Sequence, residues 1–266
     1  KFNYCLDLSL WYCFIFLLNL LINNFIFISA NQITYFTSRL KMSELKWVPL
    51  ESNPDVMNNF LKKVGVSSEW AVVDVLGLDD DVLEFVPRPV AALIFLFPSS
   101  DDNITVGRQN KGDEKSDGVF FMHQTMRNAC GTIALIHAVA NSTDKINFEP
   151  NSSLKSFIDS TKTLSPDEIG KKLESNEQIC SAHETVAQEG QTDVPDVNEK
   201  TNGHFVALVQ QNGQLYELGR ISTPINHGPT TDEGFLHDAA RVCREYINKN
   251  PNNPNFTVVA LSVKQE

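Results

Sequence analysis

The spacing of hydrophobic positions predicts alternating helices and strands from residue 52 onward. A helical repeat follows the capping sequence Ser52-Asn53-Pro54 and is expected to stop at Gly65. Strands are predicted at 70–75 and at 90–97, where the run VAALIFLF is continuous enough for a strand buried on both faces. This first third of the domain therefore predicts one helix and two strands.

The middle of the chain carries two predicted helices and two long polar stretches. VFFMHQ (119–124) is expected to re-enter the fold as a strand after the polar loop 99–118. An apolar run starts at Cys130, with Asn128 as the expected N-cap, and Ser165-Pro166-Asp167-Glu168 predicts a capping box. Residues 174–203 contain few large apolar side chains and predict a long loop.

The last third predicts a β-hairpin, a helix and a closing strand. HFVALVQQNGQLYEL predicts two strands on either side of Asn212-Gly213, the strongest short-range hairpin signal. A helix is predicted over about 232–248 and a strand over 256–263. Hairpin-linked strands among helices indicate a mixed α/β domain of the α+β type, with a largely antiparallel sheet flanked by helices.

Residues 1–41 differ in composition from everything after them. The run from Leu8 to Ala30 is almost uncharged and long enough to cross a membrane, although asparagines interrupt it. The chain opens on Lys1, and Met42 begins ordinary globular sequence. We expect residues 1–41 to be untranslated message read in frame, with a signal or membrane anchor as the alternative, and residues 42–266 to be the functional domain.

The domain is acidic. Residues 1–41 hold three of the 22 basic and one of the 33 acidic side chains, so residues 42–266 keep 19 basic and 32 acidic ones, a net charge of −13. Such a charge argues against a nucleic-acid partner and suits a neutral or basic protein.

The domain holds three cysteines, Cys130, Cys180 and Cys243, without CxxC pairs or a metal-ligand spacing. The pattern is typical of a reducing compartment, so we expect a cytoplasmic protein without metal or cofactor. Asn141 begins an Asn-x-Thr sequon at the end of the Cys130 helix, an awkward place for a glycan, and this also favours the cytoplasm.

Cys130 is the first candidate for chemistry. It precedes a run of good helix formers, so its sulfur is expected in the first helical turn, where free N–H groups and the helix dipole stabilise a thiolate. A buried apolar cysteine is the alternative.

Gln124 and His204 are the candidates to accompany the thiol. Gln124 is expected at a strand end, where its amide could face an oxyanion beside Cys130 or be no more than a polar strand end. Of the six histidines, His204 is the best placed, because it starts a strand directly after the long polar loop.

Long segments resemble the ubiquitin C-terminal hydrolases, with the short L-type members as the nearest match. They are FMHQTMRNACGTIALIHAVAN, HETVAQEGQT, GHFVALVQQNGQLYEL, PINHG and the opening WVPLESNPDVMNNFLKKVGV. The resemblance implies a papain-like cysteine peptidase fold with a six-stranded sheet and a knotted backbone. It makes Cys130 the nucleophile, His204 the general base and Gln124 the oxyanion donor, and it makes 174–203 a loop arching over the site.

The sequence departs from the family at the catalytic acid. The family has Asp-Gly-Arg after LYEL, whereas here Leu218 runs directly into Gly219-Arg220. Glu217 shares a strand face with the missing position but falls about 6.6 Å short of it. A sequencing or gene-model error, a weakened enzyme, and partial substitution by Glu217 are the three explanations, and we favour the error.

Three functions follow from these observations. The first is a monomeric thiol hydrolase that removes small or flexible adducts from the C-terminal glycine of ubiquitin, or of a ubiquitin-like protein. The second is a ubiquitin-binding module whose hydrolysis is weakened by the lost Asp. The third is a hydrolase tethered to a membrane through Leu8–Ala30.

Overall fold

The computed structural model describes residues 46–98, 118–193, 203–219 and 223–265. They contain a six-stranded sheet in the order β1-β6-β2-β3-β4-β5, in which every neighbouring pair is antiparallel. The strands are β1 (Trp70–Asp74), β2 (Val90–Pro98), β3 (Gly203–Gln211), β4 (Gln214–Leu218), β5 (Ile225–Pro229) and β6 (Thr257–Val263). The predicted antiparallel sheet is confirmed.

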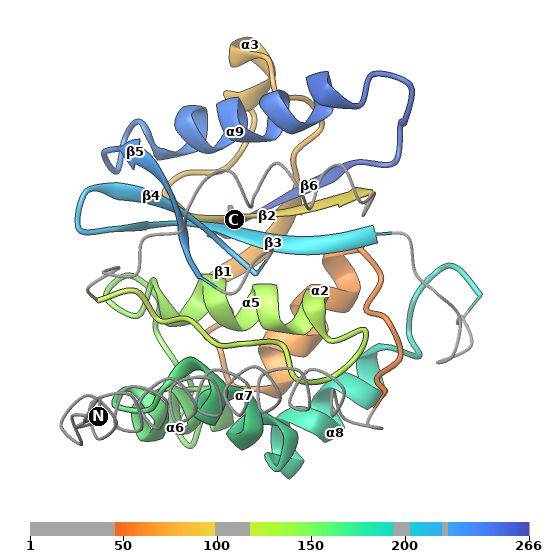
Figure 1. The fold of residues 1–266 in the computed structure, drawn as a ribbon, viewed down its shortest axis with the longest axis vertical. Coiled ribbons are helices and arrows are strands. Elements are labelled where there is room, and N and C mark those ends of the chain that lie inside the picture. The colour runs from red at the N-terminus through yellow and green to blue at the C-terminus, as the bar shows by residue number, and fades with distance from the viewer. Residues whose placement is uncertain (1–45, 99–117, 194–202, 220–222, 266) are drawn as a thin grey trace, which may run out of the picture. The chain divides into compact units, whose positions relative to one another are not determined.

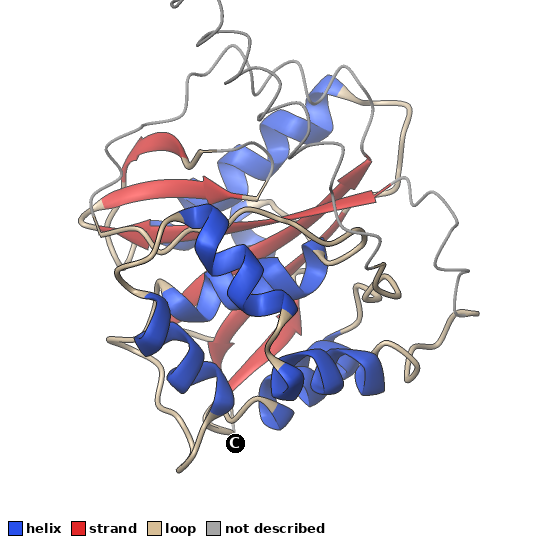
Figure 2. Cartoon of the chain, turned by 60° about the horizontal axis from the view of Figure 1, so that its bottom comes forward, coloured by secondary structure: helices blue, strands red, loops and turns tan. Residues whose placement is uncertain are grey.

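Helices cover both faces of this sheet. They are α2 (Pro54–Lys63), α3 (Asp80–Leu83), α5 (Cys130–Ala140), α6 (Ser153–Thr161), α7 (Pro166–Glu174), α8 (Glu177–Val186) and α9 (Phe235–Lys249). Figure 1 shows α9 and the short α3 above the sheet, α5 and α2 below it, and α6, α7 and α8 beyond them. In the turned view of Figure 2, the strands again lie between helices.

The sheet separates two hydrophobic clusters because side chains alternate between its faces. On β3, Phe205, Ala207 and Val209 pack on the α5 side, whereas Val206 and Leu208 pack on the α9 side. Strand β2 is buried along most of its length, as its continuous apolar run predicts. The hydrophobic effect therefore fixes both layers of helices on the central strands.

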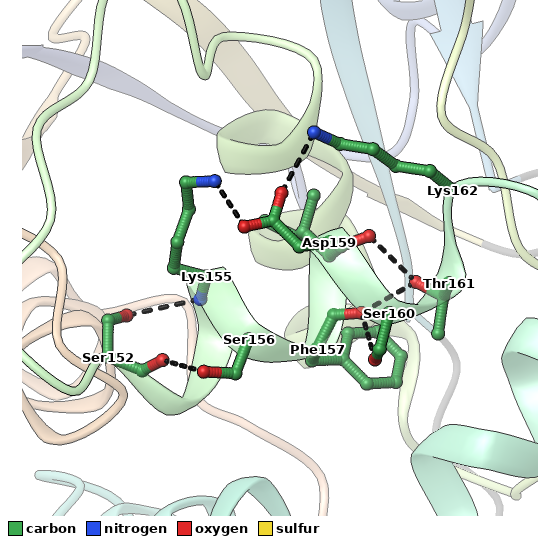
Figure 3. A network of polar contacts seen from close by, with 9 residues as sticks. Ser152, Lys155, Ser156, Phe157, Asp159, Ser160, Thr161 and Lys162 are labelled. Atoms are coloured by element: carbon green, nitrogen blue, oxygen red, sulfur yellow. Dashed lines mark hydrogen bonds and ion pairs between the residues drawn. The ribbon is translucent and has the colours of Figure 1, made fainter.

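Local capping sequences set the helix starts. Asn53 caps α2 through a bond from the Asp55 N–H, and the predicted capping box joins Ser165 to Glu168 at α7. Helix α6 buries Leu154, Phe157 and Ile158 in the core, and polar contacts within the helix tie its exposed side chains together. In Figure 3, Asp159 lies between Lys155 and Lys162, and Ser152 accepts a bond from the N–H of Lys155.

The predicted hairpin is confirmed. Strands β3 and β4 pair from Gln211–Gln214 to Ala207–Leu218. At the turn, Asn212 and Gly213 both adopt positive φ angles, 52° and 71°, as a tight hairpin turn requires.

Two local predictions were wrong. Residues 119–124 form no strand, because their backbone bonds to helix side chains instead of to a neighbouring strand. The first part of the expected long loop is helical, since Ile179, Ala182, His183 and Val186 give α8 a buried face.

No helix in the described ranges is both long and apolar enough to cross a bilayer. The apolar run Leu8–Ala30, most of the polar loop 99–118 and residues 194–202 of the expected arching loop lie outside these ranges.

Candidate active site

Cys130 is the first residue of α5 and is partly exposed. No side chain caps this helix: Ala129 is the N-cap residue, and Asn128 has a positive φ of 64° and donates its side-chain amide to the Trp47 carbonyl. The predicted capping by Asn128 is therefore wrong. Without a capping side chain, N–H groups of the first turn remain available to the sulfur.

Close packing brings the start of α5 against β3. A Cβ atom at Gly131 would lie 3.0 Å from Cβ of Leu50 and 3.3 Å from the Phe205 ring, so a side chain there would crowd the contact. The backbone N–H groups of Gly131 and Phe205 both bond to the Cys130 sulfur. The glycine thus places the thiol beside two backbone donors.

His204, the second residue of β3, lies next to the thiol and hydrogen bonds to it. Its Nε2 lies 2.9 Å from the carbonyl oxygen of Gly219, and its ring packs edge-on against Phe97. Because Nε2 is occupied by the Gly219 carbonyl, Nδ1 is the nitrogen that remains for the thiol. The backbone of Gly219 places this carbonyl with a φ of 113°, a conformation that residues with a side chain rarely adopt.

The thiol and the imidazole change each other's pKa. Burial alone would raise the pKa of Cys130, but the hydrogen bond and charge of His204 and the two backbone N–H groups lower it below its usual value. Burial alone would lower the pKa of His204, but the bond to Cys130, the thiolate charge, the Gly219 carbonyl and the charge of Glu217 raise it. Both shifts favour a thiolate–imidazolium pair.

Glu217 is fully buried on β4, where it pairs with Leu208 without a slip in register. Its carboxylate bonds to the imidazole of His227 at 2.9 Å and to the hydroxyl of Tyr246 at 3.0 Å. These partners direct the side chain toward α9. Its negative charge acts on His204 through the protein interior.

Gln124 is half-buried in the extended segment before α5. Its side-chain Nε2 donates a hydrogen bond to the Met126 carbonyl at 2.8 Å. An amide nitrogen has two hydrogens, so this bond leaves one of them for another acceptor.

The other cysteines lie away from this pair. Cys180 is on α8, where burial raises its pKa, and Cys243 is buried on α9, where burial raises its pKa further. Sequence reasoning did not find the Gly219 carbonyl or the Phe205 N–H, since both are backbone groups. The only signal was the glycine directly after β4.

A thiol at a helix start, paired with an imidazole and backed by a β-sheet, is the arrangement of a cysteine-type hydrolase. The family model "Ubiquitin carboxyl-terminal hydrolase, family 1" matches residues 47–248, and the chain belongs to this family.

Similar proteins support this assignment. A ubiquitin carboxyl-terminal hydrolase of Drosophila melanogaster is 46% identical over 230 residues, which are 84% of this chain and all of the relative. The human isozyme L1 is 45% identical over 218 residues, which are 80% of this chain and 96% of the relative.

Solved structures show the same fold. The catalytic domain of Trichinella spiralis UCH37, bound to ubiquitin vinyl methyl ester, matches with a TM-score of 0.69 and 24% identity, over 84% of this chain and 99% of that one. A second UCH37 structure with the same ligand matches with a TM-score of 0.64 and 24% identity, over 82% of this chain and 83% of that one. The predicted papain-like architecture of the family is thereby confirmed.

Proposed function

We propose that the chain is a thiol-dependent deubiquitinating hydrolase in which Cys130 is the nucleophile, His204 the general base and acid, and Gln124 an oxyanion donor. The observation that carries the proposal is the hydrogen-bonded pair of Cys130 and His204, whose pKa values shift toward the charged forms. This pairing of nucleophile and base is what covalent catalysis by a thiol requires.

The reaction would proceed in two steps. The Cys130 sulfur attacks the carbonyl carbon, while Gln124 and backbone N–H groups stabilise the oxyanion. The tetrahedral species collapses to a thioester, and His204 gives its proton to the departing group. Water, deprotonated by His204, then attacks the thioester and releases the carboxylate and the free thiol.

Ubiquitin is the substrate that the family and the acidic domain favour. The relatives are named for ubiquitin, and the UCH37 structures hold a ubiquitin derivative. By the family resemblance, the part of the predicted loop 174–203 that follows α8 would arch over the nucleophile, so leaving groups on the terminal glycine should be small or flexible. A ubiquitin-like protein remains a second substrate to test.

A ubiquitin-binding module with weak hydrolysis is the second candidate. The observation that favours it is the neutral Gly219 carbonyl at the nitrogen of His204 where the family has a carboxylate. A carbonyl orients the ring but contributes no charge to stabilise imidazolium. Glu217 contributes its charge to His204, while its Oε2 bonds to both His227 and Tyr246.

Fluorophore release from ubiquitin with a C-terminal amide dye separates the two candidates when binding of unmodified ubiquitin is measured beside it. Turnover that disappears in Cys130→Ala supports the hydrolase. Ubiquitin binding without turnover supports the module, and neither binding nor turnover contradicts both.

We also propose that residues 42–266 act as a monomer in the cytoplasm. The three cysteines of this domain are free thiols, as a reducing compartment requires. Sedimentation of the purified chain at the mass of a dimer, or recovery of the expressed chain in the membrane fraction, would contradict this assignment.

A further inference from the structure

The segment that carries Gln124 lacks a neighbouring strand. Residues 119–125 run extended between the helices, and Gln124 itself bonds only locally, to Met126. An extended backbone that pairs with no strand must bond its N–H and carbonyl groups to other partners. Those partners determine where Gln124 lies.

Helix α5 supplies two of these partners as side chains. Asn141, at its C-terminal end, accepts a bond from the Phe120 N–H at 2.8 Å and donates one to the Phe120 carbonyl at 2.9 Å. His137, one helical turn earlier, accepts a bond from the Met122 N–H through Nε2 at 3.0 Å. Asn141 and His137 thus replace the hydrogen bonds of an adjacent strand.

The opposite side of the segment rests on α7. The His123 N–H donates to the Pro166 carbonyl at 3.1 Å, and the His123 ring bonds to Asp167. A Cβ atom at Gly170 would lie only 2.5 Å from the His123 carbonyl oxygen. The segment therefore has little room to move away from α5.

The imidazole of His137 is buried in the core, and only one of its two nitrogens has a hydrogen-bond partner among the described residues. It is completely buried, and its ring stacks on Phe121 with the centroids 5.4 Å apart. Burial lowers its pKa to about 3, so the ring is neutral, and the bond from Met122 requires the proton to be on Nδ1. Nδ1 has no hydrogen-bond partner among the described residues.

A buried N–H without a partner destabilises the folded protein, whereas an apolar side chain would fill the space without this cost. The gain at this position is the bond that Nε2 accepts from the N–H of Met122, two residues before Gln124. The same helix begins at Cys130, seven residues earlier and on the same helical face. Helix α5 thus carries the nucleophile at one end and the supports of the oxyanion donor farther along.

We propose that His137 is a positioning residue, which holds Gln124 at the correct distance from Cys130 by bonding the Met122 N–H. This inference rests on the proposed function, because it needs Gln124 to act on an oxyanion. The role is distinct from catalysis, since the His137 ring is buried and bonds backbone.

The test uses the full chain and ubiquitin with a C-terminal aldehyde. The Cys130 thiol adds across the aldehyde, so that sulfur bonds to carbon and the oxygen takes the proton. The tetrahedral adduct resembles the intermediate without requiring turnover. Calorimetry gives the dissociation constants of unmodified ubiquitin and of the aldehyde. The first constant divided by the second measures stabilisation of the tetrahedral oxygen separately from ubiquitin binding.

His137→Met and His137→Gln form a matched pair, because their side chains are similar in length but only Gln has a strong acceptor. We expect His137→Met to lower the ratio roughly tenfold, since a misplaced donor loses much of its effect. His137→Gln should retain most of the ratio. In a Gln124→Ala background, His137→Met should lower it no further.

Val139→Ala is the control for a general loss of packing. Val139 is buried on α5 about half a turn from His137, so this substitution should lower the melting temperature without changing the ratio. Equal losses in both His137 variants, or losses that add to that of Gln124→Ala, would overturn the positioning role and leave the proposed function intact. An aldehyde that binds no tighter than ubiquitin to the unchanged chain would overturn both.

Discussion

Nε2 of His204 lies 2.9 Å from the carbonyl oxygen of Gly219. A carbonyl only accepts, so Nε2 carries a proton and Nδ1 is left unprotonated in the neutral ring. In the proposed hydrolase, this carbonyl would orient the His204 ring as an acid does, but without supplying the charge of an acid.

Gly219→Ala should lower kcat about tenfold, because its φ of 113° strains any side chain and the relaxed backbone would turn the carbonyl away from His204. Gly228→Ala is the matched control, with a φ of 100° and nothing within 4 Å of the added Cβ. Both variants should lose about 1–3 kcal/mol of stability in urea denaturation. Equal activity in the two variants would argue against the carbonyl's role.

Insertion of Asp between Leu218 and Gly219 should raise kcat by roughly 10- to 100-fold. The expected gain is smaller than the ~10⁴ attributed to the acid in serine-protease triads, because the thiolate already stabilises imidazolium here. Insertion of Ala at the same place is the control for the added length. A gain with Ala would mean that strand length, and not the carboxylate, limits the rate.

Alkylation of Cys130 by iodoacetamide should be faster at neutral pH than that of Cys180 or Cys243. The pKa of Cys130 is lowered and the pKa of His204 is raised. The reactive ion pair therefore forms as the pH rises through the pKa of Cys130, and it is lost as the pH rises through the pKa of His204. Burial raises the pKa of the other two thiols. Peptide mass spectrometry follows all three thiols in one sample, and His204→Ala should reduce the preference for Cys130, because it removes the largest effect that lowers the pKa of this thiol.

Glu217→Gln should move the alkaline limb of the activity profile to lower pH, because the charge of Glu217 helps to raise the pKa of His204. The variant should also lose about 1–3 kcal/mol of stability, since Glu217 is buried against His227 and Tyr246. Tyr246→Phe is the control, because it removes a hydrogen bond and keeps the charge. An unchanged limb in Glu217→Gln would show that the charge does not reach His204.

Stability should fall as the pH drops from about 6.5 to about 4. Burial lowers the pKa of His183 to about 4, and its ring bonds the Thr132 hydroxyl and the Val48 carbonyl. The unfolded chain therefore binds a proton in this range before the folded chain does, which costs roughly 1 kcal/mol per pH unit. His137, with a pKa of about 3, adds a loss of the same sign.

Urea denaturation at several pH values measures this effect. His183→Gln should flatten the dependence between pH 6.5 and 4, and the remaining slope should belong mainly to His137. A slope that His183→Gln leaves unchanged would assign the acid sensitivity to other groups.

Local signals in the sequence determined most of the elements. The hairpin of β3 and β4 around Asn212-Gly213, the capping box at Ser165 and the apolar run after Cys130 each depend on neighbours within a few residues. The departure from the family motif after Leu218 was also visible, because the compared residues are contiguous there. The knotted backbone stays a prediction.

Only the tertiary structure decided how the site is assembled. Cys130 and His204 are 74 residues apart, and their contact depends on the packing of Gly131 against Phe205. The same holds for Gln124. Its segment was predicted as a strand, but side chains of α5, and not a neighbouring strand, bond to its backbone. Periodicity shows which faces are buried, but the partner of each buried group depends on contacts between distant parts of the chain.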